Sequence, residues 1–253
     1  MIKLILLNTM LAVGLTSTVY SAPLTGIKAE ATGEPIEKID SSKLPQTGEG
    51  VLIVEDSELA NIKLPQHITF ALDSQKKLGY VPRKSYAAVQ LIAMKKHHFQ
   101  SPGDVKFFTT NEPTDTHLKK SLSNIKLAFD YHPLSFILDK DTLGFAPAMT
   151  YLNSGWTGIV QYFNYPVVGT CKYMKSSVTL NGSAIRLSKK QISLYINKKP
   201  AQVMNEGRKE EGFAYLLHWY DNQYFHELSC ATETYTPEAA KKMISLATKI
   251  DNE

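Results

Sequence analysis

The second half of the chain alternates short apolar segments with turn residues. The segments are rich in branched and aromatic side chains, and Gly, Asn, Asp or Pro separates most of them from the next. Short strands joined by tight turns are typical of an antiparallel sheet. The pattern therefore predicts an antiparallel β-meander. We expect strands at residues 158–165, 191–197, 201–204, 213–220 and 223–230, and a hairpin over residues 176–187 with Asn181-Gly182 at its tip.

The segment over residues 213–230 predicts a second hairpin, with Asp221-Asn222 as a two-residue turn. This register would place His218 opposite Phe225, on the face away from His226. A three-residue turn would instead place His218 across from His226. The residues that we expect to share one buried face are Trp219 with Tyr224, Leu217 with His226, Tyr215 with Leu228, and Phe213 with Cys230.

The chain ends in a segment that predicts a helix. Thr236 suits the cap position and Pro237 suits the first helical position. A helix with one apolar stripe packs on one face of a sheet. The apolar residues at helical spacing are Ala240, Met243, Ile244, Ala247 and Ile250.

The first half of the chain mixes helix and strand signals. Residues 51–55, 67–73 and 105–110 have the pattern of short strands. Ser85 can cap a helix that follows it, and residues 115–125 indicate a short helix. The predicted fold class is α+β: an antiparallel β-meander in the C-terminal half with a packed C-terminal helix, and mixed helices and strands in the N-terminal half. We expect a single globular domain over residues 51–253.

The N-terminal segment has the features of a secretory signal peptide over residues 1–21. Lys3 is the only charge before a mostly apolar run that is shorter than the about 20 residues of a transmembrane helix. Residues 22–50 contain seven Gly or Pro and no aromatic residue, so we expect a flexible linker or arm. We therefore predict a secreted or periplasmic protein with no integral membrane span after signal cleavage.

The chain has two cysteines, Cys171 and Cys230. In an oxidising compartment two cysteines are most simply one disulfide, with free thiols or a catalytic cysteine as the alternatives. A bridge between them would close a loop of about 60 residues and would stabilise the fold by roughly 4 kcal/mol.

The charge pattern argues against a nucleic-acid partner. The formal net charge is +4, and the lysine pairs are scattered and interleaved with acidic residues rather than gathered in a stripe. We therefore expect the partner to be a small ligand or a protein.

No motif in the chain identifies an enzyme or a cofactor. It lacks a nucleophile elbow, a Walker loop, a dinucleotide fingerprint and a zinc-protease motif. His226 and Cys230 have the spacing of two zinc ligands on a helix, but on a strand four residues span about 13 Å, too far for one ion. We predict no metal and no cofactor, and we favour a protein without catalytic activity.

Residues 150–166 hold the aromatic side chains best suited to recognising a ligand. Tyr151, Trp156, Tyr162 and Tyr165 could line a groove for a sugar, a peptide or an acyl chain. Trp156 lies between Gly155 and Gly158, so we expect it in a turn. The alternative is that the four rings belong to the core.

These observations favour an exported, soluble, non-catalytic binding or interaction protein of the bacterial envelope or extracellular space. One alternative is an extracytoplasmic hydrolase whose site assembles from distant residues, among them His132, His218 and His226. Another is a secreted inhibitor or effector of a second protein, acting through the loop at residues 205–212 or the N-terminal arm. A polar cleft with two of these histidines within hydrogen-bond reach would favour the hydrolase, and an apolar groove beside Trp156 would favour binding.

Overall fold

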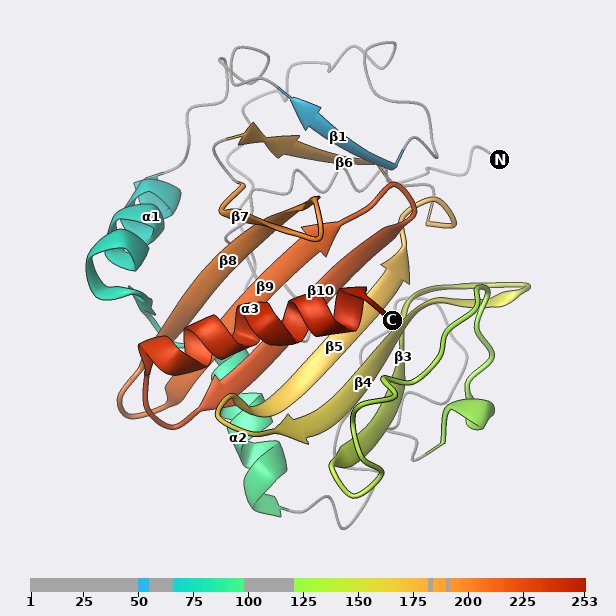
Figure 1. Ribbon diagram of the computed structural model, residues 1–253, viewed down its shortest axis with the longest axis horizontal. Helices are drawn as coiled ribbons and strands as arrows, with labels where there is room; N and C mark the ends of the chain where they lie inside the picture. Colours follow the sequence, from blue (N-terminus) through green and yellow to red (C-terminus); the bar gives the residue numbers. More distant parts are fainter. Residues whose placement is uncertain (1–49, 55–65, 98–120, 182–183, 190–191) are drawn as a thin grey trace, which may run out of the picture.

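The computed structural model describes residues 50–54, 66–97, 121–181, 184–189 and 192–253. A mostly antiparallel sheet lies at the centre of this part of the chain, with helices on both faces (Figure 1). The helices are α1 Gln66–Leu78, α2 Tyr86–His97 and α3 Pro237–Asp251, with a 3-10 turn, η3, at Leu122–Asn124. The strands are β1 Gly50–Val54, β2 Val81–Pro82, β3 Thr142–Leu152, β4 Gly155–Tyr165, β5 Gly169–Ser177, β6 Ala184–Ser188, β7 Leu194–Ile196, β8 Lys199–Arg208, β9 Gly212–Tyr220 and β10 Tyr224–Thr232.

Two meanders make up the main sheet. Strands β3, β4 and β5 pair in chain order, and β8, β9 and β10 do the same. Strand β10 also pairs antiparallel with β5, which joins the two meanders. Strand β7 forms a hairpin with β8, β2 runs parallel to β8, and β1 pairs with β6 in a separate parallel sheet. The predicted antiparallel sheet and C-terminal helix are confirmed.

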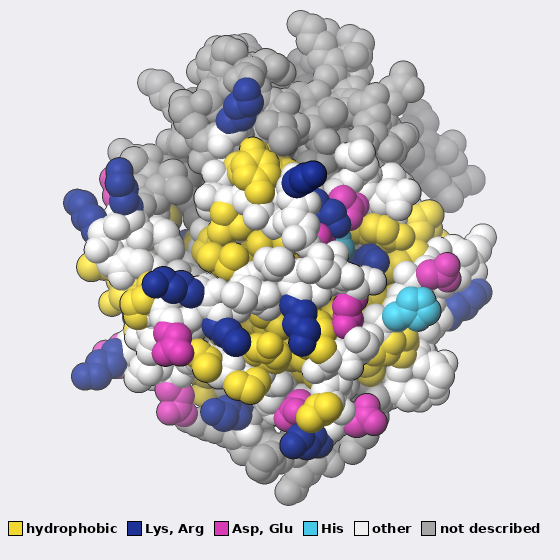
Figure 2. Space-filling view, in the orientation of Figure 1, with side chains coloured by type: hydrophobic (Ala, Val, Ile, Leu, Met, Phe, Trp, Pro, Cys, Tyr) yellow, Lys and Arg dark blue, Asp and Glu magenta, His cyan; other side chains and the backbone are white. Residues whose placement is uncertain are grey.

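Helix α3 crosses one face of the main sheet (Figure 1). Thr236 caps it as predicted, because its side chain accepts a hydrogen bond from the backbone N–H of Ala239 over 3.1 Å. Lysines and a glutamate cover its outer side (Figure 2). Full burial of a Met, Leu or Ile side chain contributes about 1.5–3 kcal/mol, so the inner side holds the helix on the sheet. The buried residues of α3 are Ala239, Met243, Leu246, Ala247 and Ile250.

Helix α2 lies against β5, β9 and β10 on the opposite face. Ser85 caps it as predicted, since its hydroxyl accepts the backbone N–H of Ala88 over 3.2 Å. Leu91 and Met94 are buried in one cluster with Tyr162 of β4. The sheet therefore separates two cores, one under α3 and one under α2.

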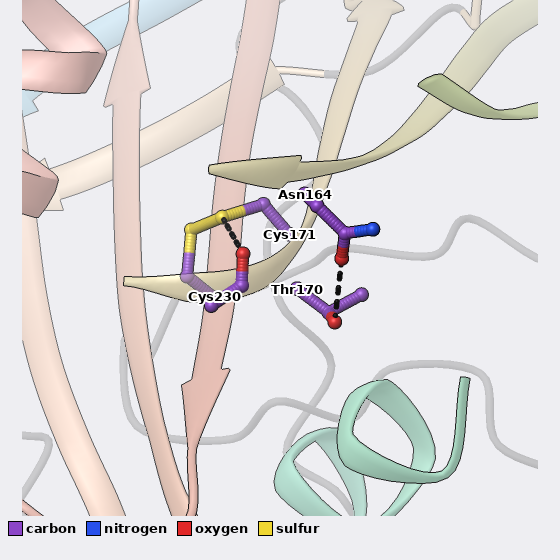
Figure 3. Close-up of a disulfide and its surroundings, with 5 residues drawn as sticks. Asn164, Thr170, Cys171 and Cys230 are labelled. Atoms are coloured by element: carbon purple, nitrogen blue, oxygen red, sulfur yellow. Dashed lines mark hydrogen bonds between the residues drawn. A yellow bond between two sulfur atoms is a disulfide. The ribbon is translucent and has the colours of Figure 1, made fainter. Parts of the chain in front are cut away.

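Cys171 of β5 and Cys230 of β10 lie directly opposite each other, with Cα atoms 4.0 Å apart. Their sulfur atoms are 2.06 Å apart, at disulfide distance, within the core under α3 (Figure 3). The bridge joins the two meanders at the strand pair where they meet. A cysteine pair at this distance is consistent with a protein outside the cytoplasm. None of the helices in the described ranges is long and apolar enough to cross a membrane.

Two of the expected strand features are wrong. Residues 67–73 lie in helix α1, because a short apolar run also fits a helix, and the buried Ala71 and Ser74 have helical spacing. The hairpin over residues 176–187 does not form. Strand β5 pairs with β4 and β10, whereas β6 pairs with β1, so the segments on either side of Asn181 belong to different sheets.

Trp156 lies in strand β4 rather than in a turn. The preceding Gly155 has φ of 132°, and a Cβ there would come 2.6 Å from the carbonyl oxygen of Lys126. The glycine therefore marks a close approach of two backbone segments, which is the other common reason for glycine in a strand.

The predicted loop at residues 205–212 is shorter than expected, because β8 continues to Arg208 and β9 begins at Gly212. Several predictions lie outside the described residues. They are the signal peptide at 1–21, the linker at 22–50 except Gly50, the strand at 105–110 and most of the helix at 115–125.

The hairpin of β9 and β10 is shifted by two residues from the predicted register. Trp219 pairs with His226 instead of Tyr224, and His218 pairs with Glu227. Because side chains alternate between faces with a period of two, this shift leaves every residue on its predicted face. His218 and His226 therefore lie on opposite sides of the sheet, as predicted.

The turn of this hairpin explains the shift. The backbone N–H of Asp221 bonds to the carbonyl oxygen of Tyr224 over 3.0 Å, so Asp221 still belongs to the ladder. Its carboxylate accepts the backbone N–H groups of Gln223 and Tyr224 at 2.8 and 2.6 Å. An aspartate that bonds to the backbone two residues on forms an Asx turn, which moves the tip from Asp221-Asn222 to Asn222-Gln223.

Candidate functional site

A polar cleft of about 510 Å³ opens on the α3 face of the sheet, beside the C-terminal end of α3. It is lined by segment 130–134, by side chains of β5 and β8, by the β9–β10 turn and by the end of the chain. Acidic, basic and histidine side chains lie near one another on this face (Figure 2). The cleft thus assembles from parts of the chain that are far apart in sequence.

The register of the sheet builds the floor of the cleft. Lys175 of β5 pairs with His226 of β10, and His226 pairs with Trp219 of β9. These side chains form one row on the α3 face. Tyr173, two residues before Lys175, points to the same side because strand side chains alternate.

His226 is buried and makes contacts on both its edges and one ring face. Tyr173 Oη lies 2.8 Å from His226 Nδ1, and Asp221 Oδ2 lies 3.3 Å from His226 Nε2. The Trp219 ring stacks on the imidazole at a centroid distance of 4.9 Å. Burial lowers the pKa of His226 and outweighs the opposing effect of Asp221. A neutral imidazole with Nε2–H donating to Asp221 and Nδ1 accepting from Tyr173 satisfies both contacts.

Asp221 is ionised and firmly held. Burial would raise the pKa of its carboxyl group, but the hydrogen bond from His226 and those from the backbone N–H groups of Gln223 and Tyr224 hold the pKa well below its usual range. Lys199 Nζ adds an ion pair at 3.3 Å. Asp221 is therefore a structural anion that fixes both the turn and the imidazole.

Lys199 and Asp251 join the end of α3 to the sheet. Asp251 Oδ1 accepts hydrogen bonds from Lys199 Nζ at 2.7 Å and from Trp219 Nε1 at 2.8 Å. Burial opposes the charge of Lys199, but the hydrogen bond and charge of Asp251, together with Asp221, raise its pKa. Asn197 Nδ2 donates to the other oxygen of Asp251 at 3.0 Å. Three donors therefore share the Asp251 carboxylate.

Segment 130–134 forms a wall of the cleft and is anchored to the sheet through Gln161. This buried side chain of β4 accepts the Tyr131 hydroxyl at 2.9 Å and the backbone N–H of Leu134 at 3.1 Å. Glu253, at the end of the chain, accepts the backbone N–H of Ser135 at 2.9 Å. The wall is thus tied to both the floor and the C-terminus.

Lys175 differs from the other charged groups on the floor. Its Nζ lies over the Tyr224 ring, 4.3 Å from the centroid, and no carboxylate of the described residues lies within ion-pair distance. It is half-buried, and burial lowers its pKa against the raising effect of Asp221. The cleft therefore contains a partly desolvated ammonium group that no carboxylate of the described residues pairs with.

The aromatic candidates do not line this cleft. Tyr151 and Trp156 pair across β3 and β4, with ring centroids 5.2 Å apart. Tyr165 lies at the other end of β4, and its ring centroid is 6.3 Å from that of Phe136. Tyr162 is buried on the opposite face, in the core under α2. The structure brings together Tyr151 and Trp156 and separates them from the other two rings.

The candidate histidines are divided between the two faces. His132 and His226 line the cleft, and His132 is exposed there. His218 lies on the other face, where its Nε2 is 3.6 Å from Glu227. No hydrogen bond joins two histidines within the described ranges, and no group of three or more His, Cys, Asp or Glu there could hold a metal ion.

Sequence reasoning missed Tyr173, Lys175, Lys199 and Asp251. A usable signal existed for two of them, because Tyr173 and Lys175 follow Cys171 at intervals of two on one strand. If Cys171 faces the core, both must face the same side. Lys199 and Asp251 carried no such signal.

The side chains of the cleft are better suited to stabilising charges than to transferring protons. Both ring nitrogens of His226 are engaged within the protein, and burial raises the pKa of Tyr173 well above its usual value. A general base needs a free nitrogen or oxygen within reach of the bound molecule.

Comparison of the chain with protein-family models, with curated proteins and with solved structures finds no match.

We expect the protein to lose stability as the pH falls from about 7.5 to about 5. Burial lowers the pKa values of His226 and His218. A group whose pKa is lower in the folded state gains a proton on unfolding. Its contribution is therefore complete above the unfolded histidine pKa of about 6.5 and is lost as the pH falls toward the folded value.

Urea unfolding across this pH range measures the effect. His226→Gln should remove part of the pH dependence, whereas His132→Gln, which replaces an exposed histidine of the same cleft, should retain it. A wild-type free energy of unfolding that does not change with pH would contradict the prediction.

Proposed function

We propose that the chain is an exported, non-catalytic binding protein of the bacterial envelope or extracellular space, and that it binds a small polar ligand in the cleft. The observation that carries this proposal is that contacts within the protein already hold the reactive side chains of the cleft. Asp221, His226 and Asp251 are fixed by contacts within the protein. The volume of about 510 Å³ falls in the range of ligand pockets, about 300–1,000 Å³.

Export is part of this proposal. We infer a signal peptide over residues 1–21, a linker over residues 22–50 and one α+β domain over residues 51–253. The cysteine pair at disulfide distance supports this location, since disulfides persist in oxidising compartments.

Binding is favoured over hydrolysis by the position of the histidines. His226 has no free ring nitrogen to offer a substrate, and His218 lies on the other face of the sheet. His132 is exposed at the cleft, and no described acid orients its ring. A hydrolytic site would need a base held toward the bound molecule.

A thermal-shift screen of the full chain tests the proposal. The compounds are grouped as small anions, zwitterions, neutral polyols and cations, and the matched variant is Asn222→Trp, which narrows the mouth of the cleft. Because a ligand that binds only the folded state stabilises it, we expect one group to raise the melting temperature of the wild type by about 2–5 °C. Asn222→Trp should lose this shift while its own melting temperature stays near that of the wild type.

The bound compound is then recovered and examined by mass spectrometry. An unchanged compound supports a binding protein, whereas a hydrolysed one would establish the hydrolase instead. Equal shifts in the wild type and in Asn222→Trp would place binding elsewhere and would contradict the proposal.

A further inference from the structure

We propose that the cleft selects its ligand by a negatively charged group, a carboxylate or a phosphate, that pairs with Lys175. This inference rests on the proposed function and adds the chemical class of the ligand. It follows from the position of Lys175, from the state of the carboxylates around it and from the neutral groups at the mouth of the cleft.

Lys175 is placed for this role by the sheet. It lies in the floor row beside His226, and Tyr173, two residues before it on β5, faces the core under α3. A partly buried ammonium group is unfavourable because it has lost hydration, and no carboxylate in the described part of the chain pairs with this one. The Tyr224 ring 4.3 Å away compensates only in part. A ligand anion would supply the missing ion pair and accept the ammonium donors that the ring does not use.

The acidic residues of the cleft do not compete for this lysine. Asp221 accepts two backbone N–H groups and pairs with Lys199 and His226. Asp251 accepts hydrogen bonds from Lys199 and other donors, and Glu253 bonds to the wall of the cleft. Each of these carboxylates already has a donor, so none requires a cationic ligand. Asp130 is exposed, where water screens its charge.

The mouth of the cleft adds neutral polar groups. The side chains of Asn222 and Gln223 are exposed on the turn and line the opening. Their amides can donate to a ligand oxygen without bringing charge. Lys175 is thus the group that sets the sign of the ligand, and the amides suit a polar body beyond the anionic group.

Isothermal titration of the full chain tests the inference. The probes are inorganic phosphate, citrate, glucose and putrescine at constant ionic strength and pH 7.5. The variant is Lys175→Met, which keeps the length of the side chain and removes its charge. The matched control is Lys242→Met, because Lys242 also lies over a tyrosine ring, that of Tyr165 at 5.9 Å, but outside the cleft.

We expect phosphate or citrate to bind to the wild type and to Lys242→Met alike, and the affinity to fall at least about tenfold in Lys175→Met, as for the loss of a charged hydrogen bond. The phosphate and citrate arms distinguish the two sources of negative charge. Glucose and putrescine should not bind. Equal affinities of Lys175→Met and the wild type would overturn the inference, and so would failure of both anions to bind with a Kd below about 10 mM.

The outcomes separate this inference from the proposed function. If glucose or putrescine binds to the wild type and Asn222→Trp abolishes this binding, the inference of an anionic ligand is overturned. The cleft would remain a binding site. No shift from any group in the thermal screen would overturn both. If Lys175→Met does not fold, Lys175→Arg and Lys175→Gln replace it. The arginine variant should then bind the anion and the glutamine variant should not, and the reverse result would overturn the inference.

Discussion

Replacing Trp219 by alanine is expected to lower the free energy of unfolding by about 3–5 kcal/mol, the range for removing a large buried aromatic ring. Trp219 is fully buried beneath the cleft and packs in the core under α3. Its ring stacks on His226, and its Nε1–H donates to Asp251. The variant would leave a cavity and also remove one donor from a buried carboxylate. Urea unfolding monitored by far-UV circular dichroism measures the change.

One further variant isolates the hydrogen bond of Trp219, and another serves as the control for removing an aromatic ring. Trp219→Phe keeps a ring but loses the hydrogen bond to Asp251, and we expect it to cost about 1.5–3 kcal/mol, the range for a bond to a charged group. Tyr195→Ala removes an exposed ring, 61% accessible, and should leave stability within about 0.5 kcal/mol of the wild type. A loss in Trp219→Ala no larger than in Tyr195→Ala would show that the ring does not support the fold.

The fold was predictable where a segment shows on its own which face it buries. The alternation in residues 213–230 identified β9 and β10, and it assigned Trp219 and Cys230 to one face even though the register was two residues off. The cap and stripe of α3 were equally local signals. Where the pairing partner is distant, no such signal exists. Strand β1 pairs with β6 about 130 residues away, and the contact of β5 with β10 overrides the turn signal at Asn181-Gly182.

The cleft was less predictable than the fold, because its parts meet only through tertiary structure. The sequence separates His226 from His218 correctly, but it gives no reason to place Asp221 beside the imidazole. That contact depends on the Asx turn, which a count of turn residues does not detect. Lys175 was the accessible clue, since a lysine on the face of a core cysteine needs a polar environment. Asp251 and segment 130–134 reach the cleft by the packing of α3 and through Gln161.

Removing the cysteine pair with Cys171→Ala and Cys230→Ala together is expected to lower the free energy of unfolding by about 4 kcal/mol. The two residues are 59 positions apart, and a cross-link over such a loop restricts the unfolded chain strongly. The loop contains β6, β7, β8 and β9. Without the bridge, only hydrogen bonds and packing hold β5 against β10, where the two meanders meet. Urea unfolding of the wild type and the double variant measures the difference.

Reductant provides the internal control for this experiment. It should destabilise the wild type by about as much as the double substitution does, and it should leave the double variant unchanged, because no disulfide remains to reduce. A small additional loss in the variant is expected from the space left by two fully buried side chains. The wild type, denatured without reduction, should show no reactive thiol. Two reactive thiols there would contradict both the bridge and the oxidising location that we infer from it, whereas the packing of α3 on the sheet would be unaffected.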